Sequence, residues 1–132
     1  MGSTDVGLAP GLTGTATLTV TEADTAVALR SGDVPVLATP RVVALAEEAT
    51  VAAVAGVLAP GRTTVGSRVE LEHLAPSVLG ATVVAQARLD QVDGRRLSFV
   101  VSVVDGATEV ARGRVDRVVV ERERFLARAV GQ

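Results

Sequence analysis

The stretch that decides the fold is residues 36–61, VLATPRVVALAEEATVAAVAGVLAPG. Residues 42–59 carry no charge except the adjacent pair Glu47 and Glu48. A helix that is apolar on nearly every side is buried in a protein core. The two carboxylates at its middle therefore need an explanation, which is either a solvated face or a chemical role.

The ends of this helix have recognisable signals. Thr39 stands where an N-cap residue is favoured, and Pro40 follows at the first helical position. Pro60-Gly61 follows the apolar run. The pattern predicts a helix that begins at Thr39 and ends near Ala59.

Segments with alternating apolar and polar residues lie on both sides of the helix, and a short helix is possible over residues 22–30. Asp-Gly pairs separate three of these segments, which is the strongest local signal for a β-hairpin. We expect the last four strands to form an antiparallel meander. The strands are predicted at residues 13–21, 63–73, 81–92, 95–104 and 108–120.

One long helix against a curved antiparallel sheet of about five strands is an α+β architecture called the hot-dog fold. We assign residues 12–121 to a single hot-dog domain, residues 1–11 to a flexible N-terminus and residues 122–132 to a C-terminal extension. Such a sheet leaves edges and a helix flank that a second copy covers. We therefore expect a homodimer.

Composition excludes several kinds of protein. The chain has 132 residues, of which 48% are hydrophobic, and a net charge of −2, so one domain with a sizeable core is expected and nucleic acid is not a partner. It has no cysteine and a single histidine, which argues against a metal site. The N-terminus lacks a signal-peptide pattern, and no apolar run is long enough to span a membrane. We expect a cytoplasmic protein without a cofactor.

Helical geometry separates the two carboxylates. At about 100° per residue, Glu47 shares a stripe with Val43, Val51 and Val54, whereas Glu48 falls on the face of Arg41. Of the two carboxylates, Glu47 is thus the one expected to be partly buried. The alternative is that both residues form a solvated face, and Thr39 is equally interpretable as a helix cap alone.

Two residues of the strand at 63–73 are candidates for a site. Alternation places His73 on the face of Val65, Val69 and Leu71, toward the helix or a pocket. Gly66 interrupts the strand, which marks a bulge, a bend or a close approach by a ligand. A core histidine and a simple bend are the alternatives.

Arg117 aligns with the apolar face of the last strand. An arginine there extends to solvent, pairs with an acid, or meets a phosphate. No G-x-S-x-G elbow, Walker A motif or G-x-G-x-x-G motif occurs. A carboxylate together with an imidazole remains as possible machinery for acyl chemistry.

Four blocks together resemble the fluoroacetyl-CoA thioesterase-like family of the hot-dog superfamily. The likeness covers roughly residues 34–125. The blocks are VLATPRVVALAEEA, GRTTVGSRVELEHLAPSVLG, LDQVDGRRLSFVVSVVDG and VARGRVDRVVVERERF. The resemblance implies an acyl-CoA thioesterase that hydrolyses a small or medium acyl-CoA to the free acid and CoA.

The resemblance also implies roles for particular residues. Thr39, Glu47 and His73 match the catalytic set. Gly66 matches a glycine beside the acyl carbonyl and Arg117 an arginine near the end of the last strand, so the resemblance implies that these two residues bind substrate. The fluoroacetate-specific enzyme has phenylalanines in the loop before its catalytic threonine. Residues 31–37 here contain no aromatic residue, so specificity for fluoroacetyl-CoA is not expected.

Three alternative functions remain open from the sequence. They are a non-catalytic acyl-CoA-binding or small-ligand-binding module, a hot-dog hydratase or dehydratase, and a structural dimer without a pocket. Hot-dog hydratases and dehydratases usually have an aspartate about five residues from the catalytic histidine. The residues five positions from His73 are Arg68 and Val78, which counts against this function.

Overall fold

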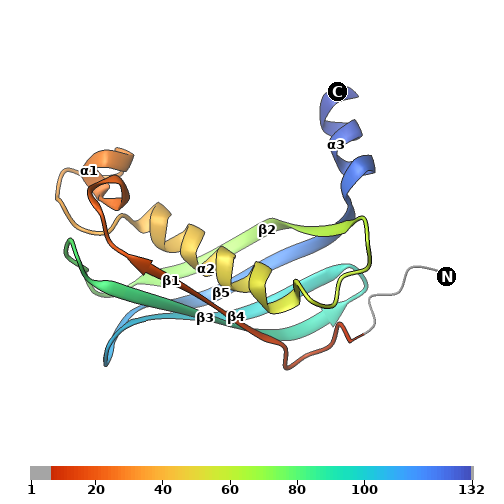
Figure 1. Ribbon diagram of the computed structural model, residues 1–132, viewed down its shortest axis with the longest axis horizontal. Coiled ribbons are helices and arrows are strands. Elements are labelled where there is room, and N and C mark those ends of the chain that lie inside the picture. Colours follow the sequence, from red (N-terminus) through yellow and green to blue (C-terminus); the bar gives the residue numbers. More distant parts are fainter. Residues whose placement is uncertain (1–6, 132) are drawn as a thin grey trace.

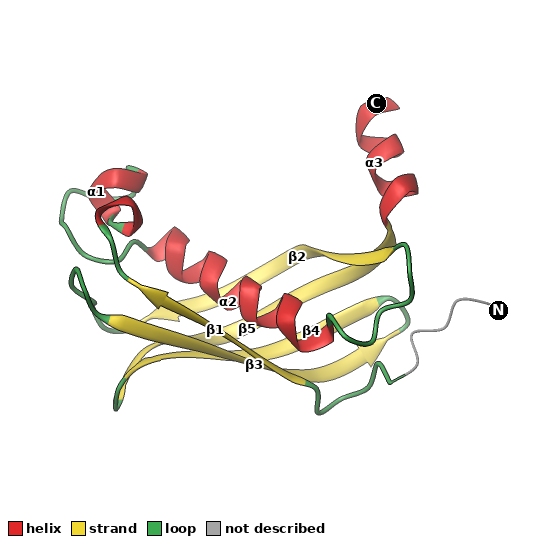
Figure 2. Ribbon diagram, in the orientation of Figure 1, coloured by secondary structure: helices red, strands yellow, loops and turns green. Residues whose placement is uncertain are grey.

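The computed structural model describes residues 7–131, so the expectation for residues 1–6 and for residue 132 lies outside the described part. Helix α2 lies across the concave face of a curved sheet, α1 sits at one end of it and α3 projects at the other (Figures 1 and 2). This is the predicted α+β hot-dog architecture. The elements in chain order are β1 (Thr13–Thr19), the 3-10 turn η1 (Glu22–Asp24), α1 (Ala26–Leu29), α2 (Thr39–Val54), β2 (Arg62–His73), β3 (Thr82–Asp93), β4 (Arg96–Asp105), β5 (Thr108–Glu121) and α3 (Arg122–Gly131).

The strand order corrects one prediction. The sheet has five strands in the order β1-β3-β4-β5-β2, and all neighbours are antiparallel. Only β3, β4 and β5 form a meander, so the predicted four-stranded meander is wrong. Strand β2 crosses to the far side of β5 because β1 occupies the free edge of β3. As a result β2 is an edge strand.

A β-bulge in β2 corrects a second prediction. The register against β5 shifts between Gly66 and Arg68, which leaves Ser67 without a partner. Such a bulge reverses which alternate residues face the core. Thr64 rather than Val65 is therefore buried on the helix side, whereas His73 faces the helix as predicted.

Small residues allow α2 to lie close to the sheet. A Cβ atom at Gly14 of β1 would collide with the backbone of Ala49 and Ala53 in α2. The buried face of α2 packs on large side chains of the sheet such as Phe99, and this contact forms the core. The buried residues of α2 are Val42, Leu45, Ala46, Ala49, Thr50, Ala53 and Val54.

Helix α2 begins at Thr39 as predicted, but its capping residue and its C-terminal end differ from the prediction. Ala38 is the N-cap and Thr39 the first helical residue, so the Thr39 side chain does not cap the helix. At the other end the helix stops at Val54 instead of near Ala59. The amide of Val57 bonds to the carbonyl of Val54, a tight turn that forms around Gly56 and replaces the α-helical pattern.

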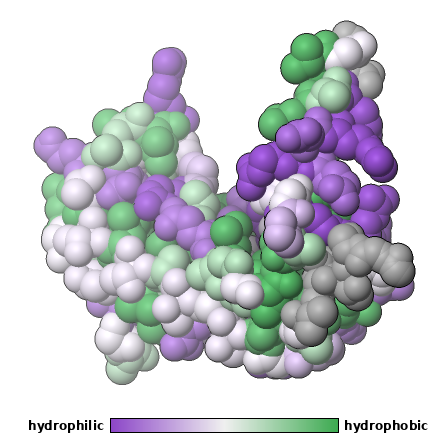
Figure 3. Space-filling view, turned by 45° about the vertical axis from the view of Figure 1, so that its right-hand side comes forward, coloured by the Kyte–Doolittle hydropathy of each residue, from purple (hydrophilic) through white to green (hydrophobic). Residues whose placement is uncertain are grey.

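Helix α3 stands clear of the body of the protein, and its visible surface mixes hydrophilic and apolar residues (Figure 3). It corresponds to the predicted C-terminal extension, and none of its residues is buried. The domain boundary at residue 121 remains a prediction. Among residues 7–131, no helix is long and apolar enough to cross a membrane.

The close approach of β1 to α2 can be tested with two glycine substitutions. We expect Gly14→Ala to lower the free energy of unfolding by about 2 kcal/mol, because the new methyl group meets backbone atoms that cannot move aside cheaply. Gly56→Ala is the matched control, since no atom lies within 4 Å of its added Cβ. Urea unfolding of both variants measures the difference, and equal stabilities would contradict the packing described here.

Candidate active site

Thr39 and His73 meet where the start of α2 lies beside the end of β2. Thr39 is at the first position of α2 and His73 is the last residue of β2. The Thr39 hydroxyl and His73 Nδ1 share a hydrogen bond of 2.8 Å. Their contact joins the start of the helix to the end of the strand, so the two predicted residues do come together.

The surroundings of His73 keep its ring neutral. Burial lowers the pKa of His73, and the Ala75 backbone opposes this effect only in part. The second ring nitrogen, Nε2, is buried and makes no hydrogen bond of good geometry with the described residues. A buried polar atom without a partner calls for an explanation, and a substrate or a second subunit would provide one.

Glu47 belongs to a second cluster, organised by Arg117. Arg117 Nη1 donates to Glu47 Oε2 at 3.1 Å, Nε donates to Thr64 Oγ1 at 2.8 Å, and Nη2 donates to the Thr64 carbonyl at 3.0 Å. The side chain of Arg117 is only 8% exposed, whereas that of Glu47 is 34% exposed. Burial lowers the pKa of Arg117, and the charge and hydrogen bond of Glu47 oppose this shift. The arginine therefore positions the carboxylate.

Gly66 is the surface against which the Glu47 carboxylate rests. A Cβ atom at residue 66 would collide with Glu47 Oε2 and would lie 3.5 Å from Arg117 Nη1. Only glycine leaves room for the carboxylate at this point. The bulge that begins here brings the backbone of β2 next to a charged oxygen, which is the arrangement that the strand glycine indicated in the sequence.

The predicted catalytic residues form two clusters within one chain, not one. Thr39 and Glu47 are separated by two turns of α2, which is roughly 12 Å along the helix axis. Among the described residues, the side-chain partner of His73 is Thr39 and that of Glu47 is Arg117. A single chain therefore does not bring the carboxylate to the imidazole.

Glu48 lies on another face of the helix, as the stripe pattern predicts. Its carboxylate accepts a hydrogen bond from Arg41 Nη1 at 3.1 Å, and its side chain is 52% exposed. The two adjacent carboxylates thus have different environments. Glu47 is held against the sheet, and Glu48 forms a surface ion pair.

A cavity of about 330 Å³ opens beside Thr39 and His73. One wall comes from the segment between α1 and α2, and the other from the residues after β2. Among residues 7–131, His73 is the one ionisable side chain that lines it, and its imidazole is the one aromatic ring there. The lining residues are Ala26, Ser31, Gly32, Val34, Val36, Leu37, Thr39, His73, Leu74, Ala75 and Pro76. Among residues 7–131, no group of three His, Asp or Glu side chains offers a metal centre.

The comparisons with known proteins agree with this architecture. The model of the family described as fluoroacetyl-CoA-specific thioesterase matches residues 20–123. The chain belongs to this family. The fluoroacetyl-CoA thioesterase of Streptantibioticus cattleyicolor is 41% identical over 93 residues, which are 70% of this chain and 67% of that protein.

Solved structures extend the family likeness to nearly the whole chain. A structure of the fluoroacetyl-CoA thioesterase FlK has a TM-score of 0.89 at 33% identity and covers 96% of this chain and 98% of its own. A thioesterase superfamily member from Thermus thermophilus has a TM-score of 0.85 at 27% identity, and the match covers 92% of this chain and 90% of that one. These matches confirm the hot-dog fold and the family that the four sequence blocks indicated.

Two elements of this family site escaped sequence reasoning. Thr64, which binds Arg117 twice, was assigned to the wrong face of β2 because the position of the bulge was not predicted. The wall of the cavity comes from residues 26–37, where no chemical motif draws attention. The glycine at residue 66 was the signal that could have located the bulge.

The lowered pKa of His73 should appear as a pH dependence of stability. The unfolded histidine titrates near 6.5, and the pKa in the folded protein is lower. The unfolded chain then binds more protons between these values, so the free energy of unfolding is highest above about pH 6.5 and falls as the pH decreases, by at most about 1.4 kcal/mol per pH unit. Urea unfolding at pH values from about 5 to about 8 measures this slope.

His73→Gln is the control for this titration. His73 is the single histidine of the chain, so the variant should lose the pH dependence over this range. Asp24, whose pKa is lowered below its ordinary 3.8, titrates outside it. An unchanged slope in the His73→Gln variant would contradict the environment assigned to His73.

Proposed function

We propose that this protein is an acyl-CoA thioesterase that hydrolyses a small or medium acyl-CoA to the free acid and CoA. The observation that carries the proposal is the Glu47 carboxylate, held by buried Arg117 against Gly66 in a chain of the fluoroacetyl-CoA thioesterase family. The similar proteins include a FlK variant in complex with fluoroacetate and CoA, with a TM-score of 0.83. The proposed reaction needs the substrate and water and no cofactor.

In the proposed reaction Glu47 takes a proton from water while the water oxygen attacks the thioester carbonyl carbon. The carbonyl oxygen becomes an oxyanion beside the main-chain N–H of Gly66, which would stabilise it. Collapse of the tetrahedral intermediate breaks the carbon–sulfur bond. The leaving sulfur takes up the proton that Glu47 received from water, so CoA departs as the thiol and Glu47 is again a carboxylate. Arg117 holds the Glu47 carboxylate in place. This positioning is its role in the scheme, in place of the substrate binding that the resemblance implied.

Direct attack by Glu47 on the carbonyl carbon is the alternative chemistry. It would form an anhydride between the acyl group and Glu47, which water then cleaves. A single turnover in heavy-oxygen water tests for this anhydride. Label in the Glu47 carboxylate requires the anhydride route with water attacking the carbonyl carbon of Glu47, whereas direct attack of water on the thioester labels the acid product alone.

His73 and Thr39 complete the site in this proposal. The neutral imidazole can donate from one nitrogen and accept at the other. Thr39 occupies Nδ1 and thereby orients the ring, which leaves Nε2 toward the reaction. From there the Nε2–H of His73 would donate a hydrogen bond to the departing sulfur and stabilise the charge that develops on it.

A homodimer would unite the two clusters. Strand β2 has a free edge, and long free edges pair readily with another strand. Val69 on its helix side is 36% exposed and Val51 on α2 is 45% exposed, so an apolar strip next to Glu47 lacks cover within the chain. A two-fold axis that crosses β2 between Val69 and Glu70 would bring Gly66 of one protomer level with the partner's His73. We propose that each active site contains Glu47 from one protomer and His73 from the other.

Specificity for fluoroacetyl-CoA is not part of the proposal. The two phenylalanines of the chain lie away from the cavity, since Phe99 is in the core and Phe125 is in α3. The cavity walls are aliphatic. We propose an acyl group other than fluoroacetyl as the physiological one.

The adjacent carboxylates provide a matched pair of variants. Glu47→Gln keeps the shape of the side chain and removes the base, so kcat for CoA release should fall by at least about a hundredfold. Glu48→Gln alters an exposed ion pair and should leave kcat within about twofold. Release of CoA from a panel of acyl-CoAs, detected with a thiol reagent, measures both. If saturable binding of these acyl-CoAs occurs without turnover in the wild type, the protein is a binding module and not an enzyme.

A mixing experiment tests the shared site. If Glu47 and His73 of different protomers form one site, a heterodimer of Glu47→Gln and His73→Ala chains has one intact site. Random exchange of the two inactive variants should then restore about a quarter of wild-type activity. Each variant refolded alone is the control. A mixture that stays inactive, with heterodimers shown by mass spectrometry, would place both residues of a site in one chain.

A further inference from the structure

The segment between β1 and α2 forms a wall of the cavity beside Thr39 and His73. It leaves β1 through η1 and α1 and returns to α2 at Ala38. Leu37 bridges back to Thr25, and the amide of Ala26 bonds to the carbonyl of Val36 at 2.8 Å. The wall is thus a loop, residues 25–37. Its two ends are paired with each other just before the first residue of α2.

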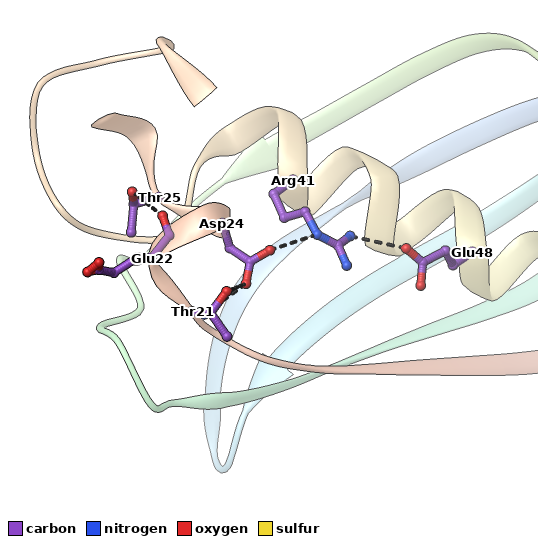
Figure 4. Close-up of polar contacts among 6 residues, drawn as sticks. All are labelled: Thr21, Glu22, Asp24, Thr25, Arg41 and Glu48. Carbon is purple, nitrogen blue, oxygen red and sulfur yellow. Dashed lines mark hydrogen bonds and ion pairs between the residues drawn. The ribbon is translucent and has the colours of Figure 1, made fainter. Parts of the chain in front are cut away.

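Asp24 anchors the base of this loop from both its main chain and its side chain. Its carbonyl accepts the amide of Ala38 at 2.9 Å, directly before Thr39. Its carboxylate accepts the amide of Thr21 at 2.8 Å and the Thr21 hydroxyl at 2.9 Å. The remaining oxygen accepts Arg41 Nε at 3.2 Å (Figure 4). The aspartate therefore ties the end of β1 to the first turn of α2.

Arg41 lies between two carboxylates that differ in burial. The Asp24 side chain is 12% exposed and the Glu48 side chain is 52% exposed. Burial alone would raise the pKa of Asp24, but the hydrogen bonds from Thr21 and Arg41 lower it, so the carboxylate is charged. Removing one member of a buried pair leaves the other charge uncompensated, whereas an exposed pair contributes little. Of its two ion pairs, the one with Asp24 is therefore the one through which Arg41 contributes to the structure.

We propose that the Asp24–Arg41 ion pair is a positioning element that sets the distance between the cavity wall and the Thr39–His73 pair, and thereby the length of acyl chain that the enzyme prefers. Asp24 directly precedes the wall, and Arg41 follows Thr39 by two residues. Neither side chain lines the cavity. The pair therefore acts through the position of the loop, not through contact with substrate.

The lining of the cavity limits the class of acyl group. Aliphatic side chains form most of the wall, and no arginine of the described chain lines the cavity to pair with a second carboxylate on the substrate. An uncharged aliphatic acyl chain fits this surface, and a dicarboxylic acyl group does not. This inference rests on the proposed thioesterase activity and names the substrate class of the same site.

Kinetics with a series of straight-chain acyl-CoAs, from acetyl to octanoyl, and with succinyl-CoA test the proposal. For wild type we expect a chain-length optimum in kcat/KM and poor turnover of succinyl-CoA. Asp24→Asn and Arg41→Met should each change the ratio of kcat/KM between the best and the neighbouring chain lengths by about tenfold, mainly through KM. Glu48→Gln is the matched control and should keep the wild-type profile.

Arg41→Lys separates positioning from a general loss of stability. Lysine keeps the charge but has one ammonium group in place of the fork with which Arg41 bridges Asp24 and Glu48. Its chain-length profile should lie between those of wild type and Arg41→Met. A structural role alone would lower kcat/KM equally for every substrate. An equal loss of this kind, or an unchanged profile in folded Asp24→Asn, overturns the proposal.

Hydrogen exchange supplies a readout that does not depend on activity. Amides of residues 25–37 should exchange at least about tenfold faster in Asp24→Asn than in wild type, and at the wild-type rate in Glu48→Gln. Wild-type protein that releases no CoA from any acyl-CoA would overturn the proposed function. Active wild type with unchanged exchange in Asp24→Asn would overturn only the role of the ion pair.

Discussion

The structure depends on the close contact between helix α2 and the concave face of the sheet. Gly14 and the alanines of α2 let two backbones approach where any larger residue would collide. Because the small residues of α2 must face the sheet, the rotation of the helix about its own axis is fixed. That rotation places Glu47 on the flank next to β2 and Glu48 toward solvent. The chemistry of the site is thus a consequence of how tightly the helix packs.

Arg117 shows how a buried charge is accommodated in such a core. Three of its donors are used by Thr64 and Glu47, so the guanidinium is neutralised and hydrogen-bonded where water is scarce. The same contacts fix the carboxylate against Gly66. A fixed carboxylate loses little further freedom on binding substrate, which favours catalysis. His73 lies at the other end of β2, and its Nε2 makes no hydrogen bond with residues 7–131, so within one chain the fold holds two separate polar clusters.

Several features were predictable because they depend on neighbours in sequence. Helical periodicity separated Glu47 from Glu48, and Gly66 within a strand indicated an irregularity. The errors arise where distant residues decide. Thr39 resembles a cap by position, yet its hydroxyl bonds to His73, thirty-four residues later. The partner of β2 was also mispredicted, because the Asp-Gly turns specify adjacent hairpins and say nothing about a strand that joins from across the sheet.

The sequence by itself determined the class of fold, the central helix, the identity of the polar residues and the family to which the chain belongs. These follow from local patterns, in which burial is encoded by the period of apolar residues. Only the tertiary structure decided which residues are partners: Thr39 with His73, Arg117 with Glu47 and Thr64, and Asp24 with Arg41. Side-chain partners depend on strand order and on the bulge in β2. A register shift of one residue moves the side chains of a strand to the opposite face of the sheet. The register is set by packing between segments far apart in the chain.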